Sequence, residues 1–190
     1  MIIGVVVGRF QVANLTEGHK LLIKKAKKNF DKVIIVIGIT KDGKLTSHDP
    51  LPYKARKKMV EDFLDEQYKE WRENEDFIIS KIRDVGNYPV WVENLDCLID
   101  ALLLVSGLKE NTKNVIIYGS RKSVAEKYKE NGGKYDVVIM TELVNSSIDH
   151  TADEHGNISG TLSREFTRTH YKPVWDEKDR KFAVWLTGNI

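Results

Sequence analysis

An α/β fold built on a parallel sheet is predicted by two features of the sequence. Short apolar runs rich in valine and isoleucine alternate along the chain with segments long enough to form helices. The runs are apolar at almost every position, which is typical of strands buried on both faces of a sheet. Parallel strands joined by helices form right-handed βαβ units, so we expect a doubly wound sheet of five parallel strands.

Five apolar runs are the expected strands: Ile2–Val7, Lys32–Gly38, Phe77–Ile82, Asn114–Tyr118 and Asp136–Met140. Helices are expected between them, over Glu17 to about Lys28, Tyr53 to about Trp71, Leu95–Val105 and Ser123–Asn131. The last of these helices precedes Gly132 and Gly133, a common signal for a helix C-terminus. The alternation predicts a Rossmann-like arrangement, with helices on both faces of the sheet.

The chain of 190 residues fits one domain with a small appendage. We expect residues 1–168 to form the domain and residues 169–190 to be a C-terminal tail packed on it. Apolar residues flank the charged segment DEKDRK in the tail and indicate a terminal hairpin: Val174, Trp175, Phe182, Val184 and Trp185. The polar stretch 141–157 is expected to be a loop.

Composition favours a cytoplasmic protein. The 41% hydrophobic and 31% charged residues suffice for a packed core and a solvated surface, and the net charge of +2 gives no reason to expect a nucleic-acid or membrane partner. The single cysteine, Cys97, excludes a disulfide framework, and its place in an apolar helix predicts burial. The first residues lack the basic region of a signal peptide, and no apolar run reaches the roughly 18 residues needed to cross a membrane.

The candidate site is expected at one edge of this sheet. In open parallel sheets, ligands bind beyond the carboxyl ends of the strands, where the strand order reverses. The segments that follow the first four strands are therefore the candidates: Gly8–His19, Gly38–Arg56, Asp84–Trp91 and Gly119–Lys122.

The first of these segments has the features of an anion site. Gly8–Gln11 leaves the strand, and Thr16, Gly18 and His19 begin the next helix. A helix N-terminus exposes backbone N–H groups and a partial positive charge, and a glycine there allows a phosphate to approach closely. Thr16 and His19 would add side-chain hydrogen bonds. The alternative is that Thr16 is only an N-cap and His19 a surface residue.

A second segment repeats this chemistry near the end of the domain. Ser159, Gly160 and Thr161 precede a charged, helix-like segment that contains Arg164. Hydroxyls, backbone amides and a guanidinium fork form an anion site of their own. Two such sites in one domain suit a polyphosphate held at both ends. The fingerprints of dinucleotide-fold dehydrogenases and P-loop kinases are missing from the sequence.

These segments resemble a known family. Thr16-x-Gly18-His19 and Ile158-Ser159-Gly160-Thr161-x-x-Arg164 are similar to the [H/T]-x-G-H and I-S-x-T-x-x-R signatures of the nucleotidyltransferase superfamily. Within it, Gly8–Gln11 resembles the opening of the nicotinamide mononucleotide (NMN) adenylyltransferases. The resemblance covers most of residues 1–168 and extends to three further segments: Pro50–Arg56, Asp84–Trp91 and Gly119–Lys122.

The resemblance implies transfer of AMP from ATP to NMN, which gives NAD and pyrophosphate, with Mg²⁺ held by substrate and water rather than by protein ligands. It implies a catalytic role for His19, Arg164 and Thr16. The implied ATP and phosphate contacts are Gly8, Arg9, Phe10, Gly18, Gly119, Ser120, Arg121, Ser159, Gly160 and Thr161. The implied acceptor contacts are Arg56, Asp84 and Trp91, with Trp91 stacked on the nicotinamide ring.

Several alternatives stay open. Most NMN enzymes have histidine where Thr16 stands, and threonine there resembles the phosphopantetheine adenylyltransferases. The chain could therefore use phosphopantetheine or another phosphate-bearing acceptor, or bind nucleotide without turnover. Arg56 could contact the domain's own loop or form a surface ion pair, and Trp91 could be a packing residue. The residues His150, Asp153, Glu154 and His155 could bind a metal, but a polar loop is the preferred reading.

The resemblance also leads to one expectation about further domains and one about assembly. Some relatives continue into a Nudix hydrolase domain, for which 190 residues leave no room. Relatives commonly assemble, so a homo-oligomer is also possible, with the apolar helix Leu95–Val105 as one contact surface.

Overall fold

The computed structural model describes residues 1–12, 14–46, 49–69, 71, 75–119 and 122–140, and the backbone of residues 171–176 and 181–186. Residues 122–124 are described by their backbone only. The expected loop over 141–157, with its possible metal cluster, lies outside these residues.

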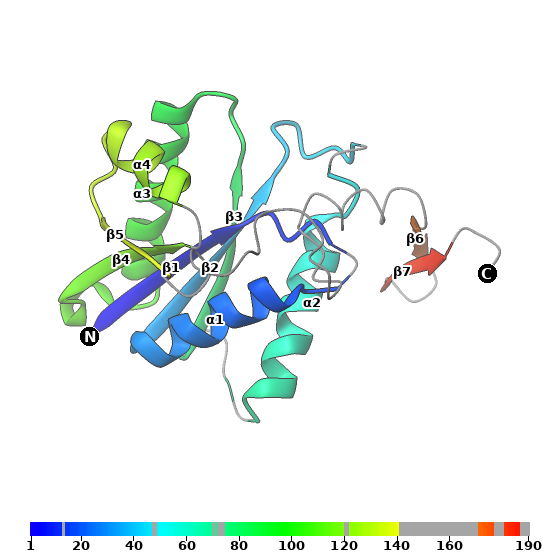
Figure 1. Ribbon diagram of the computed structural model, residues 1–190, viewed down its shortest axis with the longest axis horizontal. Coiled ribbons are helices and arrows are strands. Elements are labelled where there is room, and N and C mark those ends of the chain that lie inside the picture. The colour runs from blue at the N-terminus through cyan, green and yellow to red at the C-terminus, as the bar shows by residue number, and fades with distance from the viewer. Residues whose placement is uncertain are drawn as a thin grey trace.

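Five parallel strands form one sheet in the order β3-β2-β1-β4-β5 (Figure 1). The strands are β1 (Ile2–Gly8), β2 (Lys32–Ile39), β3 (Phe77–Arg83), β4 (Asn114–Gly119) and β5 (Asp136–Ile139). Each lies within two residues of its predicted bounds. The predicted doubly wound, Rossmann-like sheet is therefore confirmed.

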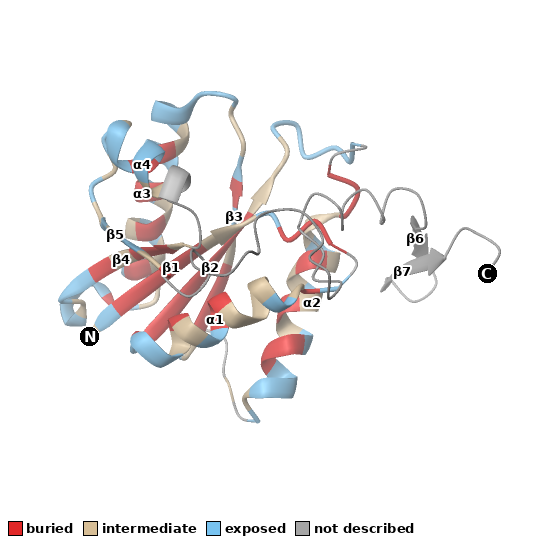
Figure 2. Cartoon of the chain, in the orientation of Figure 1, coloured by how far each residue is buried: buried red, intermediate tan, exposed pale blue. Residues whose placement is uncertain are grey.

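Helices cover both faces of the sheet, as the buried residues show (Figure 2). The helices are α1 (Glu17–Asn29), α2 (Tyr53–Gln67), α3 (Tyr88–Val105) and α4 (Lys122–Glu130), with a short 3₁₀ turn at Lys109–Asn111. Along β2, Val33, Ile35 and Ile37 face the cluster formed with α1 and α2. Ile34 and Val36 face the cluster that contains α3 and Tyr128 of α4. This alternation follows from the two-residue period of a strand.

The strand order places a topological switch point between β1 and β4. From β1 the chain adds β2 and then β3 on one side, and then returns to pair β4 with the other side of β1. In open parallel sheets, ligands bind beyond the carboxyl ends of the strands on either side of such a point. The segment that leads to His19 begins directly after β1, one of these two strands.

The start of α3 differs most from the sequence-based expectation. The helix begins at Tyr88, seven residues before the predicted start at Leu95. The Asn87 side chain caps it by accepting from the Val90 N–H at 3.2 Å, and Pro89 stands in the first turn, where a missing N–H costs nothing. Trp91 therefore lies on the first turn of a helix and not in a loop.

Cys97 corrects a second expectation. The thiol is exposed, whereas burial was predicted. Helix α3 turns Val92, Leu95 and Ile99 toward the sheet, and at about 100° per residue Cys97 falls on the outer side. The apolar residues next to Cys97 in the sequence do not determine whether the cysteine lies on the buried or the exposed face of α3.

A buried carboxylate joins α3 to the segment between α4 and β5. Asp96 accepts a short hydrogen bond from the Tyr128 hydroxyl and another from the Lys134 N–H at 3.1 Å. The same hydroxyl accepts from the Tyr135 N–H at 3.2 Å. A Cβ atom on Gly133 would lie 2.3 Å from the Tyr128 ring, so that position requires glycine. Burial and Asp96 both raise the pKa of Tyr128, which keeps the phenol protonated.

Replacing Tyr128 by phenylalanine should lower the free energy of unfolding by about 1–2 kcal/mol, because it leaves Asp96 one donor short and the Tyr135 N–H without its acceptor. Urea denaturation measures this. Tyr135→Phe is the matched control, since its partner Asp100 keeps a second donor in Lys134 and is partly exposed. An equal loss in both variants would contradict the role given to Asp96.

The predicted terminal hairpin is also present. Strands β6 (Tyr171–Asp176) and β7 (Lys181–Leu186) pair antiparallel, on either side of the charged segment. The packing of this tail on the domain stays a prediction. No helix in the described part of the chain is both long and apolar enough to span a bilayer.

Candidate active site

The turn that leaves β1 adopts a backbone conformation that few side chains take. Phe10 has φ +49°, in the left-handed region, which costs a non-glycine residue roughly 1–2 kcal/mol. Its ring is 1% exposed and lies 5.1 Å, centroid to centroid, from the His19 ring. A Cβ atom on Gly8 would lie 2.9 Å from the same ring, so the glycine leaves room for it. Phe10 thereby connects the end of β1 to the first turn of α1.

Thr16 and His19 close the N-terminus of α1 with reciprocal hydrogen bonds. Thr16 Oγ1 accepts from the His19 backbone N–H, and the Thr16 N–H donates to His19 Nδ1, each at 3.4 Å. The hydroxyl also lies 2.8 Å from Nδ1. Because a backbone N–H can only donate, Nδ1 is an acceptor, and the proton of the neutral ring is on Nε2. Thr16 is thus the N-cap, as one alternative held, and its predicted phosphate contact stays a prediction.

Two predicted phosphate-side glycines are not required by the packing of the described chain. A Cβ atom on Gly18 would have Thr16 Oγ1 as its nearest described neighbour, at 3.8 Å. On Gly119, at the end of β4, it would meet no described atom within 4 Å. A glycine in such an open position allows a ligand to come close to the backbone. The predicted phosphate contacts of both glycines stay predictions.

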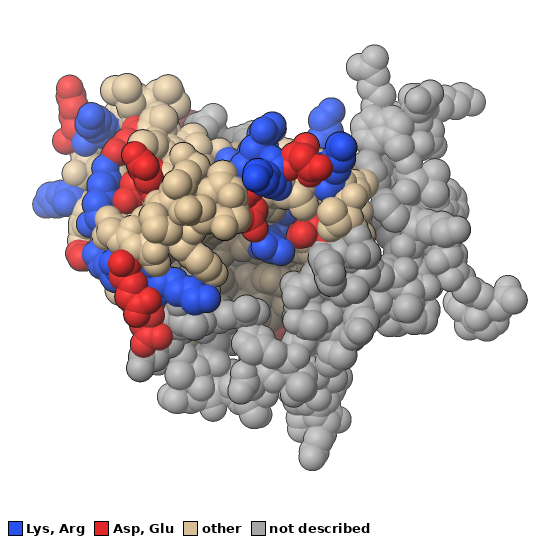
Figure 3. Space-filling view, turned by 90° about the horizontal axis from the view of Figure 1, so that it is seen from above, with Lys and Arg blue, Asp and Glu red and all other residues tan. Residues whose placement is uncertain are grey.

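The Arg9 guanidinium joins three segments at the carboxyl edge of the sheet. Nη2 donates to Asp84 Oδ2 at 2.9 Å, and Nη1 lies 3.5 Å from Asp49 Oδ2. The stem of Arg9 crosses the end of β2, where a Cβ atom on Gly38 would lie 3.5 Å from Arg9 Cγ. The Arg9 side chain is 53% exposed, so these pairs are screened by water and a competing anion can reach the guanidinium. Seen from above, basic and acidic side chains are interspersed over the described surface (Figure 3).

Gln11 holds the same turn to the connection between β2 and α2. Its amide donates to the Leu51 carbonyl at 3.1 Å and accepts from the Leu51 N–H at 2.9 Å, and the side chain is buried. The motif alone indicates no separate role for Gln11. Asp49 was not among the predicted site residues, because an aspartate before a proline forms no sequence motif that indicates a binding site.

Arg56 contacts the domain's own loops, one of the alternatives that the sequence left open. It is 2% exposed, and its Nη1 donates to the Arg9 and Gly38 carbonyls, both at 2.6 Å. Burial lowers the pKa of Arg56 to about 10, against the attraction of Asp49. The side chain is therefore charged at neutral pH. A contact with the acceptor's phosphate stays a prediction.

The predicted acceptor residues Asp84 and Trp91 follow β3. Asp84 Oδ1 accepts from the Gly86 N–H at 2.9 Å, while Oδ2 holds Arg9. Trp91 is partly buried and packs against the core beneath α3, so part of its surface serves packing. Asp84, predicted to contact the acceptor, pairs with Arg9, which was predicted to contact ATP. Trp91 lies on the first turn of α3, a few residues after Asp84 in the chain.

Several predicted site residues lie outside the described part of the chain: Ser120, Arg121, Ser159, Gly160, Thr161 and Arg164. The joining of the two anion sites therefore stays a prediction. The described residues contain no group of three or more His, Cys, Asp or Glu side chains placed to hold a metal ion.

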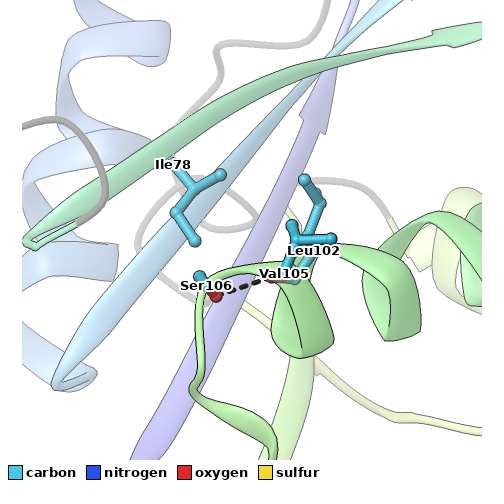
Figure 4. Close-up of a pocket in the computed structure, with 4 residues that line it drawn as sticks. All are labelled: Ile78, Leu102, Val105 and Ser106. Carbon is cyan, nitrogen blue, oxygen red and sulfur yellow. Dashed lines mark hydrogen bonds between the residues drawn. The ribbon is translucent and has the colours of Figure 1, made fainter.

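A hollow of about 270 Å³ lies away from this edge, between the start of β3 and the end of α3 (Figure 4). It is lined by Ile78, Leu102, Val105 and Ser106, and the Ser106 hydroxyl donates to the Leu102 carbonyl at 2.6 Å. None of its described lining residues is charged, so it does not fit a phosphate, and the candidate site remains the carboxyl edge.

Comparison with known proteins identifies the family. The chain belongs to the cytidylyltransferase-like family, whose model matches residues 5–166, and this confirms the predicted resemblance to nucleotidyltransferases. No curated protein matches the chain.

Solved structures show the same fold. A bifunctional NMN adenylyltransferase/ADP ribose pyrophosphatase from Francisella tularensis superposes with a TM-score of 0.55 at 23% identity, over 73% of this chain and 37% of that one. Its complex with AMP and a manganese ion gives 0.53 at 24% identity, over 73% and 36%. This chain thus matches little more than a third of those proteins.

Proposed function

We propose that this chain transfers AMP from ATP to NMN, with release of pyrophosphate. The observation that carries the proposal is the start of α1, where Thr16 and His19 close the helix N-terminus that follows β1, a strand beside the switch point of the sheet. Membership of the cytidylyltransferase-like family supports a nucleotidyltransferase. The choice of NMN rests on the resemblance of Gly8–Gln11, Asp84 and Trp91 to the NMN enzymes.

In this reaction His19 and the amides near Gly18 hold the α- and β-phosphates of ATP. The Nε2–H of His19 is the donor, since Nδ1 is used by Thr16. Ser159, Thr161 and Arg164 hold the departing pyrophosphate, by the resemblance of their motif. Fixed donors of this kind stabilise the charge that builds up on the transferred phosphoryl group.

No general base is required. The attacking group is the phosphate of NMN, whose second pKa near 6 leaves it mostly dianionic at neutral pH. The work of the protein is then to align two phosphates and offset their repulsion. Arg9 supplies positive charge at this edge. It can exchange a carboxylate for a phosphate, because its ion pair with Asp84 is exposed to water and its ion pair with Asp49 is long.

The donor set fits a magnesium ion held mainly by phosphate oxygens and water. Mg²⁺ commonly binds through one or two carboxylates at most. Asp49 and Asp84, the described carboxylates at this turn, both pair with Arg9. The ion would offset phosphate charge at the reacting centre.

Phosphopantetheine is the second candidate acceptor, because Thr16 stands where most NMN enzymes have histidine. A hydroxyl carries no charge, so phosphate binding should be weaker by roughly 1–3 kcal/mol if the histidine it replaces is a charged donor. A nucleotide-binding protein without turnover is the third possibility.

One assay separates the three. The protein is incubated with ATP, Mg²⁺ and one acceptor at a time: NMN, nicotinate mononucleotide, phosphopantetheine or FMN. We expect pyrophosphate release with the mononucleotides, and NAD by chromatography when NMN is used. Release with phosphopantetheine alone favours the second candidate, and ATP binding without release favours the third.

Replacing Trp91 by alanine should raise KM for NMN about tenfold, the loss of one stacking contact, and leave KM for ATP unchanged. Initial rates with each substrate varied in turn measure this. Tyr88→Ala is the control, because it removes an exposed aromatic ring from the same helix turn. If both KM values rise together in the Trp91 variant, its ring is a packing residue.

A further inference from the structure

We infer that Arg56 is a positioning residue for the phosphate site: its buried guanidinium fixes the Arg9 carbonyl, and through Phe10 it sets the place of the His19 ring. The effect on turnover rests on the proposed function, whereas the effect on the position of His19 does not.

A single nitrogen of Arg56 joins the ends of two strands. Nη1 of Arg56 donates to the Arg9 carbonyl, just after β1, and to the Gly38 carbonyl, within β2. Both distances are 2.6 Å, and charged donors make the stronger class of hydrogen bond. Helix α2 thereby holds the β1–α1 turn against β2.

The Arg9 carbonyl belongs to the peptide plane that precedes Phe10, and the orientation of this plane defines the φ angle of Phe10. That angle is +49°, a conformation that persists only where the surroundings impose it. Arg56 is one such constraint, and the Phe10 ring transmits it to His19 over 5.1 Å between centroids.

Packing alone gives no reason for an arginine at this position. Nε of Arg56 is buried and has no hydrogen-bond partner among the described residues. Burying a guanidinium with an unsatisfied N–H is costly, and an apolar side chain of similar length would often be tolerated in its place. Among the described residues, Asp49 and Tyr53 favour its charged form and Arg9 opposes it. The two carbonyl contacts are what an apolar residue could not supply.

The test uses the imidazole signals of the full chain in NMR spectra. The chain has five histidines, and the signal lost in His19→Ala identifies His19. In Arg56→Met the His19 ring signals should move toward those of an unstructured histidine. In Arg56→Lys they should move less than in Arg56→Met, because the ammonium keeps a charged donor beside the two carbonyls although the lysine side chain is shorter. Val60→Ala, a buried change one turn along α2, is the control and should leave them in place.

Turnover gives the second measurement. Arg56→Met should lower kcat about 10²-fold, as for a reacting group displaced by about 1 Å, while Arg56→Lys should lose less and Val60→Ala should keep most of it. If the unmodified chain transfers no AMP, the proposed function fails but the NMR prediction is still decided. Unchanged His19 signals in a folded Arg56→Met protein overturn the inference, as does an equal displacement in Val60→Ala. If the methionine variant does not fold, Arg56→Gln replaces it, since its shorter amide cannot reach both carbonyls.

Discussion

Replacing His19 by alanine should lower kcat for AMP transfer by a factor on the order of 10²–10³, the usual loss for one preorganised donor. The ring contacts Thr16 at Nδ1 and the tilted ring of Phe10, so its Nε2–H is held in place before substrate binds. Such a donor costs no reorganisation during the reaction. Pyrophosphate release at saturating ATP and NMN measures kcat.

The same substitution also removes half of the helix cap, so a second variant must separate the two effects. Glutamate is a common residue at this position of a capping box and can accept from the Thr16 N–H, but it cannot donate to a phosphate. His19→Glu should therefore melt close to the unmodified protein and be at least as inactive as His19→Ala. Recovery of activity in His19→Glu would show that the cap, and not the imidazole donor, supports turnover.

The sheet could be predicted from the sequence because its strands are buried on both faces. A run such as KVIIVIG has no amphipathic period to misread, and β2 differs from its predicted range by one residue. The start of α3 was missed because its signal is local: an asparagine cap and a proline precede any apolar repeat. Cys97 was misplaced because α3 is apolar on more than one face, and only the sheet decides which face is buried.

The sequence predicted which residue types belong to the candidate site and where they lie along the chain. It did not predict which of them contact one another. Gly18 and His19 could be assigned to a helix N-terminus because strand, turn and helix follow one another locally. The contact of Phe10 with His19 depends on a left-handed backbone, which no pattern in the sequence indicates for phenylalanine. The bonds of Arg56 run to backbone carbonyls of distant segments, and a carbonyl carries no residue identity that a sequence motif could record.

Replacing Gly8 by alanine should impair the site and the fold together. The new Cβ would lie 2.9 Å from the Phe10 ring, which is buried and has little space in which to move. Overpacking of this kind typically costs about 1–3 kcal/mol of unfolding free energy. Because Phe10 contacts His19, kcat should also fall, by a factor on the order of 10–10². Urea denaturation and the pyrophosphate assay measure the two losses.

Gly119→Ala is the matched control, because Gly119 also ends a strand of the sheet and was predicted to lie beside ATP. Its Cβ would meet no described atom within 4 Å, so the free energy of unfolding should stay within about 0.5 kcal/mol of the unmodified value. A rise in KM for ATP with unchanged stability would show that the ligand, and not the fold, requires this glycine. Equal destabilisation by the two alanines would contradict the contact between Gly8 and Phe10, and with it the link from β1 to His19.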